Sequence, residues 1–357
     1  MNPKDVANLA RPEIRALKPY ASARALADSA GILLNANESP WPPAGDGGLA
    51  LNRYPDPQPA RLKARLAELY DTRPENLLVT RGSDEGIDLL VRVFCRAGID
   101  RVLVCPPCFG MYALSARVQG AEVVQAPLID AGDRFVLPDD LREKARDCRI
   151  AFLCSPNNPT GNIISAETAG ELATAQQGSG LVVVDEAYVE FAPETAMVAL
   201  LERHPNLVLM RTLSKAHALA GCRLGAVIAH PVVIDLLRRI IAPYPLPTPT
   251  VSIAMRALAD DALAEKQQHV STLTAERHRV AAALESSPGI TKVWSGAANF
   301  LLIRAVDGPR LVADAAAAGI RLRDQSAQPG LADCVRITIG TPEENNALIG
   351  FMRGWYS

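Results

Sequence analysis

Residues 207–225 read LVLMRTLSKAHALAGCRLG, a short apolar run followed by a polar turn. The apolar run, residues 207–210, predicts a buried strand. The turn after it supplies hydroxyl groups, the amine of Lys215 and the guanidinium of Arg223, which has glycines on both sides. These groups suit an anionic ligand that also carries a carbonyl, because hydroxyls and arginine bind the anion while the lysine forms a Schiff base. Pyridoxal phosphate is one cofactor with both groups.

The chain has 357 residues, of which 48% are hydrophobic and 21% charged, and its formal net charge is −2. This length predicts two domains, and the charge balance argues against nucleic acid or an anionic membrane surface as a partner. The N-terminus lacks the apolar core of a signal peptide, and no uncharged apolar run approaches the roughly 20 residues of a membrane span. We therefore expect a cytoplasmic protein whose phosphate-binding groups are gathered locally.

The seven cysteines and five histidines do not cluster at ligand spacings, so we expect reduced thiols and no metal site. Cys105 and Cys108 have the spacing of a redox motif, but two prolines fill the middle. A redox helix would begin at the first cysteine, and prolines there do not suit it. We interpret the motif as a strand end followed by a loop, and whether the two thiols approach each other stays open.

Short apolar runs alternate with helical patterns along most of the chain. This alternation indicates a mainly parallel sheet with helices on both faces, which is a three-layer α/β domain. A stiff segment with four prolines, residues 242–250, precedes a smaller α+β domain. We predict an arm with part of the small domain at 1–45, a large cofactor-binding domain at 46–245 and the small domain at 246–357. The predicted strands are 77–80, 102–104, 122–124, 150–153, 181–184, 207–210 and 225–228, then 291–294, 300–303 and 335–339.

Ligands on such sheets bind outside the carboxyl ends of the strands, so the residues that follow each strand are the candidates. After residues 77–80 comes a turn that opens a helix, where Gly82 and Ser83 suit a phosphate through main-chain N–H groups and the Ser83 hydroxyl. We expect the carboxylates of Asp84 and Glu85 to be turned aside, because they would repel the phosphate. An ordinary helix cap explains the same residues equally well.

Three more strands end in side chains that suit pyridoxal phosphate. Asn158 suits a ring hydroxyl or a substrate carboxylate, although a turn explains it too. Asp185 would hold the proton of a pyridine nitrogen, with a helix cap as the alternative, and Tyr188 would donate to the ring hydroxyl. An aromatic ring at Phe109 or Tyr112 could stack on the cofactor, though such rings more often belong to the core.

The turn that begins with Thr212 completes this set. A serine-lysine pair after a strand is more often part of a solvated loop than of an active site. Here we expect Lys215 to act as general acid and base, with a pKa lowered by Arg223 and by exclusion of water. Thr212, Ser214 and Arg223 would bind the cofactor phosphate. The coincidence of all these groups at one sheet edge is what favours the functional interpretation.

The chain resembles the fold-type I pyridoxal-phosphate aminotransferases over essentially its whole length. The resemblance rests on Asn-Pro-Thr-Gly at 158–161, on Asp185 with Tyr188, and on Lys215 eight residues before Arg223. It implies that Lys215 carries the cofactor, that Asp185 faces the pyridinium, that Tyr188 meets the ring hydroxyl and that Arg223 binds the phosphate.

Other stretches resemble the histidinol-phosphate aminotransferase branch of that family. These are 18–20, 35–38, 52–55, 81–85, 319–324 and 336–340. The resemblance implies that Arg336 grips the substrate carboxylate or the polar end of an amino-alcohol phosphate, and that Arg323 and Tyr20 meet the substrate phosphate. It also implies that Gly82, Ser83 and Asp84 contact the cofactor phosphate, that Tyr112 stacks on the ring, and that Tyr54 reaches the cofactor phosphate of the partner in a homodimer with a shared active site.

Two points depart from that pattern or stay open. Cys108 stands where Thr-Tyr is expected before the glycine, which weakens a role for Phe109 but not for Tyr112. Arg321 and Arg323 would share a face of a strand, so either one could meet the substrate phosphate.

The resemblance implies exchange of an amino group between L-histidinol phosphate and 2-oxoglutarate, giving glutamate, in histidine biosynthesis. An aromatic transaminase and a threonine-phosphate decarboxylase of the same fold are alternatives. A non-catalytic cofactor sensor is a different class, but the chain has no basic DNA-reading domain. An NAD-dependent enzyme does not fit, because no G-x-G-x-x-G run follows Thr80.

Overall fold

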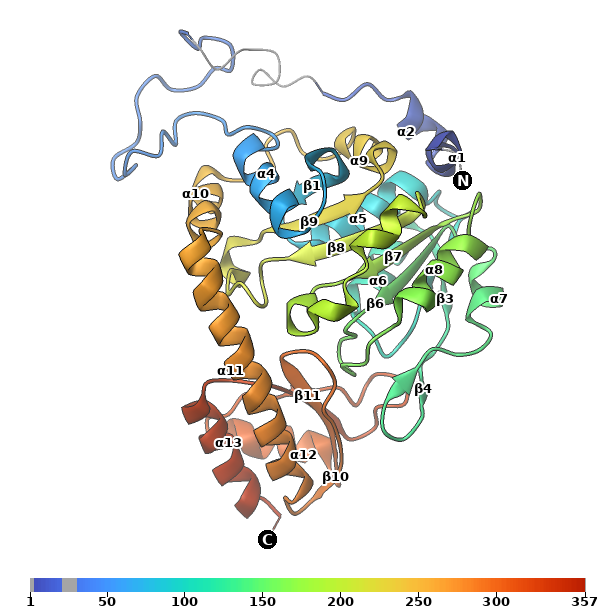
Figure 1. Cartoon of the computed structure of the whole chain (residues 1–357), viewed down its shortest axis with the longest axis vertical. Coiled ribbons are helices and arrows are strands. Elements are labelled where there is room, and N and C mark those ends of the chain that lie inside the picture. Colours follow the sequence, from blue (N-terminus) through green and yellow to red (C-terminus); the bar gives the residue numbers. More distant parts are fainter. Residues whose placement is uncertain (1–2, 21–30, 357) are drawn as a thin grey trace.

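The computed structural model describes residues 3–20 and 31–356, and its centre is a seven-stranded sheet (Figure 1). In spatial order its strands are β1 Leu77–Thr80, β9 Gly225–Ala229, β8 Leu207–Thr212, β7 Leu181–Asp185, β6 Ile150–Cys154, β2 Arg101–Val104 and β3 Glu122–Gln125. Within the described chain, β9 alone runs opposite to the other strands of this sheet, which are parallel to one another. Every strand predicted for this sheet is present.

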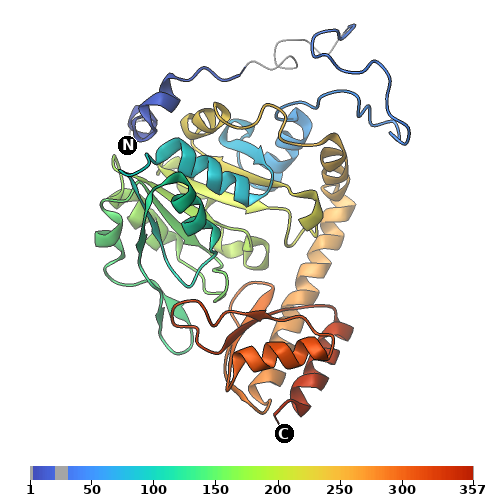
Figure 2. The ribbon, with the colours of Figure 1, turned by 180° about the vertical axis from the view of Figure 1, so that it is seen from behind.

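Helices cover both faces of this sheet. Successive side chains of a strand point to opposite faces, so Leu77 and Val79 join one core cluster while Leu78 joins the other. One face carries α5 Ser83–Phe94, α6 Met111–Gln119 and α9 Pro231–Arg238, of which α5 and α6 face the viewer in Figure 2. The other carries α4 Ala60–Leu69, α7 Leu141–Ala145, α8 Ala166–Ala175 and α10 Thr248–Ala257. The predicted three-layer α/β fold is therefore confirmed.

Short elements fill the connections between these layers. The 3₁₀ turns are Pro74–Asn76, Val189–Phe191, Pro193–Thr195, Val198–Glu202 and Ala220–Cys222. A small hairpin joins β4 Ile129–Asp130 to β5 Phe135–Val136. No helix in the described parts of the chain is long and apolar enough to cross a bilayer.

The second, smaller sheet is antiparallel and has four strands. In spatial order they are β10 Ile290–Trp294, β11 Phe300–Ala305, β13 Cys334–Thr338 and β12 Arg323–Asp324. Its core includes Leu301, Ile303 and Val335 and is completed by α12 Gly308–Ala317 and α13 Pro342–Gly354. A two-residue strand, β12, thus lies directly beside β13.

One long helix, α11 Asp260–Glu285, runs along the side of the molecule from the large sheet to the small one (Figure 1). Its 26 residues span about 39 Å at 1.5 Å per residue. Before it, Leu246, Ala254 and Leu258 pack in the core of the large sheet, whereas Val280 packs in the small-domain core. The domain boundary at residue 245 stays a prediction. The chain stops packing on the large-domain core and begins packing on the small-domain core along α11.

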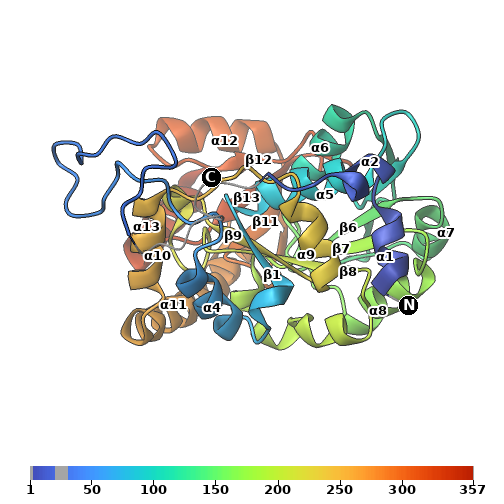
Figure 3. The same cartoon turned by 90° about the horizontal axis from the view of Figure 1, so that it is seen from above.

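The N-terminal residues divide into a packed part and an extended part. The helices α1 Pro3–Leu9 and α2 Pro12–Ala16 lie against the large domain, not the small one, because Val6, Leu9 and Ile14 are buried in its core. Residues 31–59 form a long loop, most of which stands away from the body in Figure 3, and Gln58 near its end bonds to the backbone of Val79. We predicted that residues 1–45 belong to an arm and the small domain; apolar side chains in the first helices draw 3–16 onto the large sheet instead.

Candidate functional site

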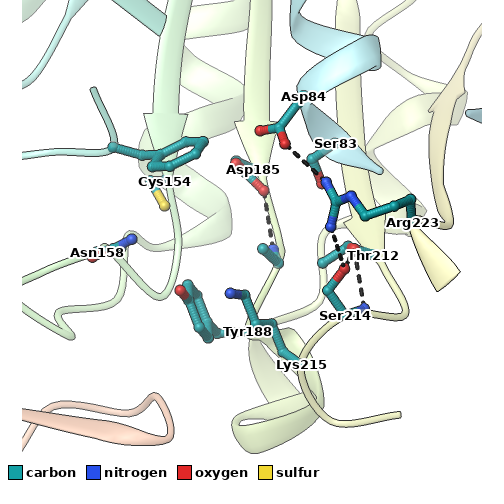
Figure 4. A pocket seen from close by; sticks show the side chains of 12 residues that line it. Ser83, Asp84, Cys154, Asn158, Asp185, Tyr188, Thr212, Ser214, Lys215 and Arg223 are labelled. Carbon is teal, nitrogen blue, oxygen red and sulfur yellow. Dashed lines mark hydrogen bonds and ion pairs between the residues drawn. The ribbon is translucent and has the colours of Figure 1, made fainter. Parts of the chain in front are cut away.

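The carboxyl ends of β1, β6, β7 and β8 meet at one edge of the large sheet and enclose a pocket (Figure 4). Nine of the predicted site residues lie in its wall, together with three that the sequence left out or discounted. The lining residues are Ser83, Asp84, Phe109, Cys154, Asn158, Asp185, Ala187, Tyr188, Thr212, Ser214, Lys215 and Arg223. The expectation that strand ends gather these side chains therefore agrees with the geometry.

Lys215 projects from a tight turn at the end of β8 toward the centre of the pocket. Two backbone bonds close this turn, from Ala218 N–H to Lys215 O at 3.1 Å and from Leu219 N–H to Leu213 O at 3.0 Å. The Nζ atom lies 5.6 Å from the ring centroid of Tyr188. Burial lowers the pKa of Lys215, and the positive charges of Arg336 and Arg223 lower it further, against an opposing effect of Asp185. An amine of this kind loses its proton more easily than an exposed lysine.

Asp185, the last residue of β7, is the buried acid of the site. Its Oδ1 accepts the N–H of Ala187 at 3.1 Å, and its Oδ2 accepts the hydroxyl of Tyr112 at 2.7 Å. Burial raises the pKa of Asp185 to about 6, while these two hydrogen bonds oppose the rise. The two donors therefore favour the charged carboxylate in surroundings that disfavour it.

The role expected of Tyr112 needs correction. Its ring is 1% exposed, packs parallel to Phe152 at a centroid distance of 4.8 Å, and does not line the pocket. Since α6 begins at Met111, Tyr112 lies in the first helical turn and points into the core. Phe109 belongs to the loop just before the helix and does line the pocket. Phe109, which the sequence discounted because of Cys108, is thus the candidate for stacking on a flat ring, and Tyr112 acts on Asp185.

The loop that carries Phe109 begins with the two cysteines. Cys105 to Cys108 lie between β2 and α6, as predicted, and all seven cysteines are free. Burial raises the pKa of the Cys108 thiol to about 12, which disfavours the reactive thiolate. The backbone N–H of Cys108 donates to Gln328 Oε1 at 3.0 Å, so this loop is attached to the small domain.

The start of α5 forms a cradle for an anion. Gly82 has a φ of 78°, and a Cβ there would lie 2.8 Å from Nη2 of Arg223. Only glycine therefore allows Arg223 to approach the helix terminus closely. The first N–H groups of α5 have no partner within the helix, and the buried Ser83 Oγ has none among the described residues. These donors, at the positive end of a helix, suit a phosphate.

Hydroxyls and a guanidinium complete the cradle. Thr212 Oγ1 donates to Ser214 Oγ at 3.0 Å and accepts the backbone N–H of Ser214 at 3.2 Å. Arg223 Nη1 lies 3.5 Å from Ser214 Oγ, and its Nη2 lies 3.0 Å from Asp84 Oδ2. The expectation that Asp84 is turned aside is therefore wrong, since its carboxylate faces the pocket and pairs with Arg223.

The second acid of that turn behaves as expected. Glu85 points away from the pocket and pairs with Arg81 at 2.6 Å. Glycine at position 82 leaves room for the guanidinium of Arg223, which forms an ion pair with the Asp84 carboxylate. A phosphate bound here would therefore meet the N–H groups of α5 while sharing Arg223 with Asp84.

The small domain places Arg336 beside this pocket, although Arg336 is not one of the lining residues. Arg336 on β13 donates from Nη1 to Asn158 Oδ1 at 2.5 Å, and its guanidinium lies 5.5 Å from the ring centroid of Phe300. Arg323 is the direct antiparallel partner of Arg336, so both side chains leave the same face of the sheet. Burial lowers the pKa of Arg336, and the charge of Arg323 lowers it further, against an opposing effect of Tyr188. Two neighbouring guanidinium cations suit the binding of an anionic group of the substrate.

The strand register also distinguishes Arg321 from Arg323 as the candidate for the substrate phosphate, which the sequence alone did not do. Both arginines are exposed, but Arg321 lies before β12 whereas Arg323 is on β12 and is paired with Arg336. The geometry therefore favours Arg323 for a substrate anion.

Two tyrosines predicted for the site are not in this pocket. Tyr20 is 75% exposed and lies just before residues 21–30, which are outside the described chain. Tyr54 is half exposed, and its ring stacks on Tyr244 at a centroid distance of 4.4 Å. Within one chain, neither tyrosine meets the groups around Lys215.

The side chains present fit pyridoxal phosphate. The buried, unpartnered Ser83 hydroxyl and the N–H groups of α5 match the phosphate, the Asp185 carboxylate matches a protonated pyridine nitrogen, and Lys215 matches an aldehyde. The described residues contain no group of three or more His, Cys, Asp or Glu placed to hold a metal. The site is thus that of a cofactor-dependent enzyme acting on amines.

Comparison with known proteins identifies the class. The sequence profile of aminotransferases of class I and II matches residues 32–351, and the chain belongs to this family. It is 47% identical to the histidinol-phosphate aminotransferase of Stenotrophomonas maltophilia (strain R551-3), over 97% of this chain and 96% of that one. It is also 47% identical to the histidinol-phosphate aminotransferase of Xylella fastidiosa (strain 9a5c), over 98% and 96%.

A solved structure agrees in fold and cofactor. The histidinol-phosphate aminotransferase of Sinorhizobium meliloti, in complex with pyridoxal 5′-phosphate, superposes with a TM-score of 0.76 and 28% identity, covering 89% of each chain. The family depends on pyridoxal phosphate, which is therefore the cofactor of this site.

The bond from Tyr112 to Asp185 leads to a first prediction. Tyr112→Phe removes the donor, so the pKa of Asp185 rises above about 6 and less of the carboxylate is charged at neutral pH. A hydrogen bond to a charged group is worth roughly 1.5–3 kcal/mol, so kcat at pH 7 should fall about tenfold. Because a raised acid pKa is overcome at higher pH, part of the loss should be recovered toward pH 9. The measurement is the pH profile of kcat.

Tyr70→Phe is the matched control, because Tyr70 is also buried and its hydroxyl has no hydrogen-bond partner among the described residues. It should leave the profile unchanged. An equal, pH-independent loss in both variants would contradict the role given to Tyr112.

Proposed function

We propose that this protein transfers an amino group between L-histidinol phosphate and 2-oxoglutarate in the biosynthesis of histidine. The observation that supports this substrate pair best is the pairing of Arg323 with Arg336, which bonds to Asn158 in the pocket wall. Both substrates carry an anionic group away from the reacting carbon, and adjacent guanidinium groups bind phosphate and carboxylate. The names of the near full-length relatives agree with this proposal.

Pyridoxal phosphate supplies an aldehyde that bonds to amines and a ring that withdraws electrons from the reacting carbon. The chain supplies the groups that bind it and move protons. Lys215 is the amine for the aldehyde, and its Nζ, freed by the incoming substrate, accepts the proton from the carbon that carries the amino group. Its lowered pKa favours the uncharged form that this step requires.

The acid and the tyrosine around Lys215 hold protons in place. Asp185, charged through its bonds to Tyr112 and Ala187, would hold a proton on the pyridine nitrogen. Burial raises the pKa of Tyr188, so its hydroxyl keeps its proton and acts as a donor to the ring oxygen. Ser83, Thr212, Ser214 and Arg223 would anchor the phosphate, and Phe109 would stack on the ring.

We further propose that two copies of the chain share their active sites. The long loop of residues 31–59 exposes Ile32, Leu34 and Trp41, at 90%, 87% and 76%. Exposed apolar side chains of this size are typical of a surface that another chain covers. Tyr54, at the base of the loop, lies outside its own pocket, which supports a contact with the cofactor phosphate of the partner. Tyr20 stays a predicted contact of the substrate phosphate, and a cytoplasmic location stays a prediction from the sequence.

The substrate proposal has a direct test. The cofactor-loaded protein is yellow, and L-histidinol phosphate alone should bleach it, after which 2-oxoglutarate should restore the colour. Absorbance titrations with histidinol phosphate and with phenylalanine give the comparison. Colour that persists with histidinol phosphate and disappears with phenylalanine would instead indicate an aromatic transaminase, and release of carbon dioxide from threonine phosphate would indicate a decarboxylase.

Arg323 on β12 and Arg321 just before it allow a sharper test. Arg323→Met should raise KM for histidinol phosphate by about tenfold or more, because one charge-assisted hydrogen-bonding group is worth roughly 1.5–3 kcal/mol. Arg321→Met, two residues away and equally exposed to solvent, should change KM less than about twofold. The reverse order of effects would transfer the role to Arg321.

A further inference from the structure

Two glycines from different domains meet beside the pocket. Gly161 lies in the turn after β6, and Gly296 lies in the loop between β10 and β11. A Cβ on Gly296 would lie 2.6 Å from Cα of Gly161, and a Cβ on Gly161 would lie 2.8 Å from Cα of Gly296. Both residues have a positive φ, 73° and 50° respectively. The two backbones are therefore in direct contact, and no side chain fits between them.

Hydrogen bonds hold this contact on both sides. The N–H of Ala297 donates to Gly161 O at 2.8 Å, and the N–H of Gly161 donates to Asn157 O at 2.7 Å. The side chain of Asn157 in turn donates to Pro107 O at 2.9 Å. The turn at Gly161 is thus attached both to the small domain and to the loop that leads to Phe109, and it has little freedom to give way.

The contact lies between the groups that must act together on a substrate. Asn158, three residues before Gly161, accepts from Arg336 at 2.5 Å. On the other side, β11 begins four residues after Gly296, and its Leu302 is the direct partner of Arg336 on β13. A displacement at Gly296 would therefore move Arg336 relative to Asn158 and to Lys215.

Other contacts between the domains are more adaptable. The ring of Phe135 on β5 packs against Trp294 at a centroid distance of 5.3 Å, and Gln328 reaches Cys108 through a long side chain. Side chains of this kind adjust by rotation about their χ angles. Two backbones in direct contact have no such freedom. The Gly161–Gly296 contact is therefore the least adaptable of these contacts between the two domains.

We propose that the Gly161–Gly296 contact sets the distance between Lys215 on the large domain and Arg336 on the small domain. Both glycines are then positioning residues that act through Arg336 on the anionic end of the substrate. The inference rests on the proposed role of Arg336 as an anion-binding residue. Its consequence is that the length of substrate accepted between the two groups depends on the absence of side chains at 161 and 296.

The test compares alanine substitutions at two glycines that both have a positive φ. Gly296→Ala adds a Cβ that meets the backbone of Gly161. Gly178→Ala is the matched control, because Gly178 has a φ of 82° and nothing within 4 Å of its Cβ position. Gly296→Ala should raise KM for glutamate about tenfold while kcat changes less than about threefold, and Gly178→Ala should leave both unchanged. Gly161→Ala probes the contact from the other side and should move KM in the same direction.

A second readout does not depend on turnover. Amide hydrogen exchange at Ala297 reports the bond to Gly161, and in the unaltered protein glutamate should slow it about tenfold, since a ligand that bridges the domains stabilises their contact. Gly296→Ala should abolish this protection. An unchanged KM in Gly296→Ala and Gly161→Ala, or an exchange rate at Ala297 that glutamate does not affect, overturns the proposal. Failure of histidinol phosphate to react, with these glutamate results intact, would count against the proposed substrate alone.

Discussion

The buried carboxylate of Asp185 is the constraint on which the site depends. It stands at the end of an entirely buried strand, where a charge without partners is costly. Tyr112 and the N–H of Ala187 donate to it, and its charge raises the pKa of the nearby Lys215. A carboxylate kept charged in this way has capacity for one more proton-bearing partner. The pyridine nitrogen of the family's cofactor is such a partner.

Positive charge is concentrated around this acid although the whole chain carries a formal net charge of −2. Arg223 lines the pocket together with the amino terminus of α5, whereas Arg336, paired with Arg323, lies against Asn158. The first group suits the phosphate of the cofactor and the second an anion of the substrate. Arg336 and Arg223 both lower the pKa of Lys215, so the cations that would bind the anions also act on the amine that must give up its proton.

Much of this arrangement follows from local sequence. Each apolar run predicted for the large sheet is a strand, and because parallel strands end at one edge, the residues after them meet there. The alternation of strands and helices was enough to predict that Lys215, Asn158 and Tyr188 lie at this edge. The resemblance to a known family added the roles of Arg323 and Arg336, which no local pattern indicates.

The errors have equally local causes. Tyr112 and Phe109 lie on opposite sides of a helix start that the sequence places only to within a residue or two, and that boundary decides which ring faces the pocket. Asp84 was expected to turn aside because a phosphate would repel it, but Arg223 comes near enough to pair with it. The register of β12 with β13 and the contact of Gly161 with Gly296 join distant segments, so neither could be predicted from spacing along the chain.

The most direct measurement of the central claim is chemical trapping of the cofactor. Borohydride reduction of the cofactor-loaded protein fixes pyridoxal phosphate on the amine to which it is bonded, and peptide mass spectrometry locates it. The account predicts the added mass on Lys215 alone, and loss of that label in Lys215→Ala. A label on any other lysine, or no label on a protein that retains its yellow colour, would contradict it.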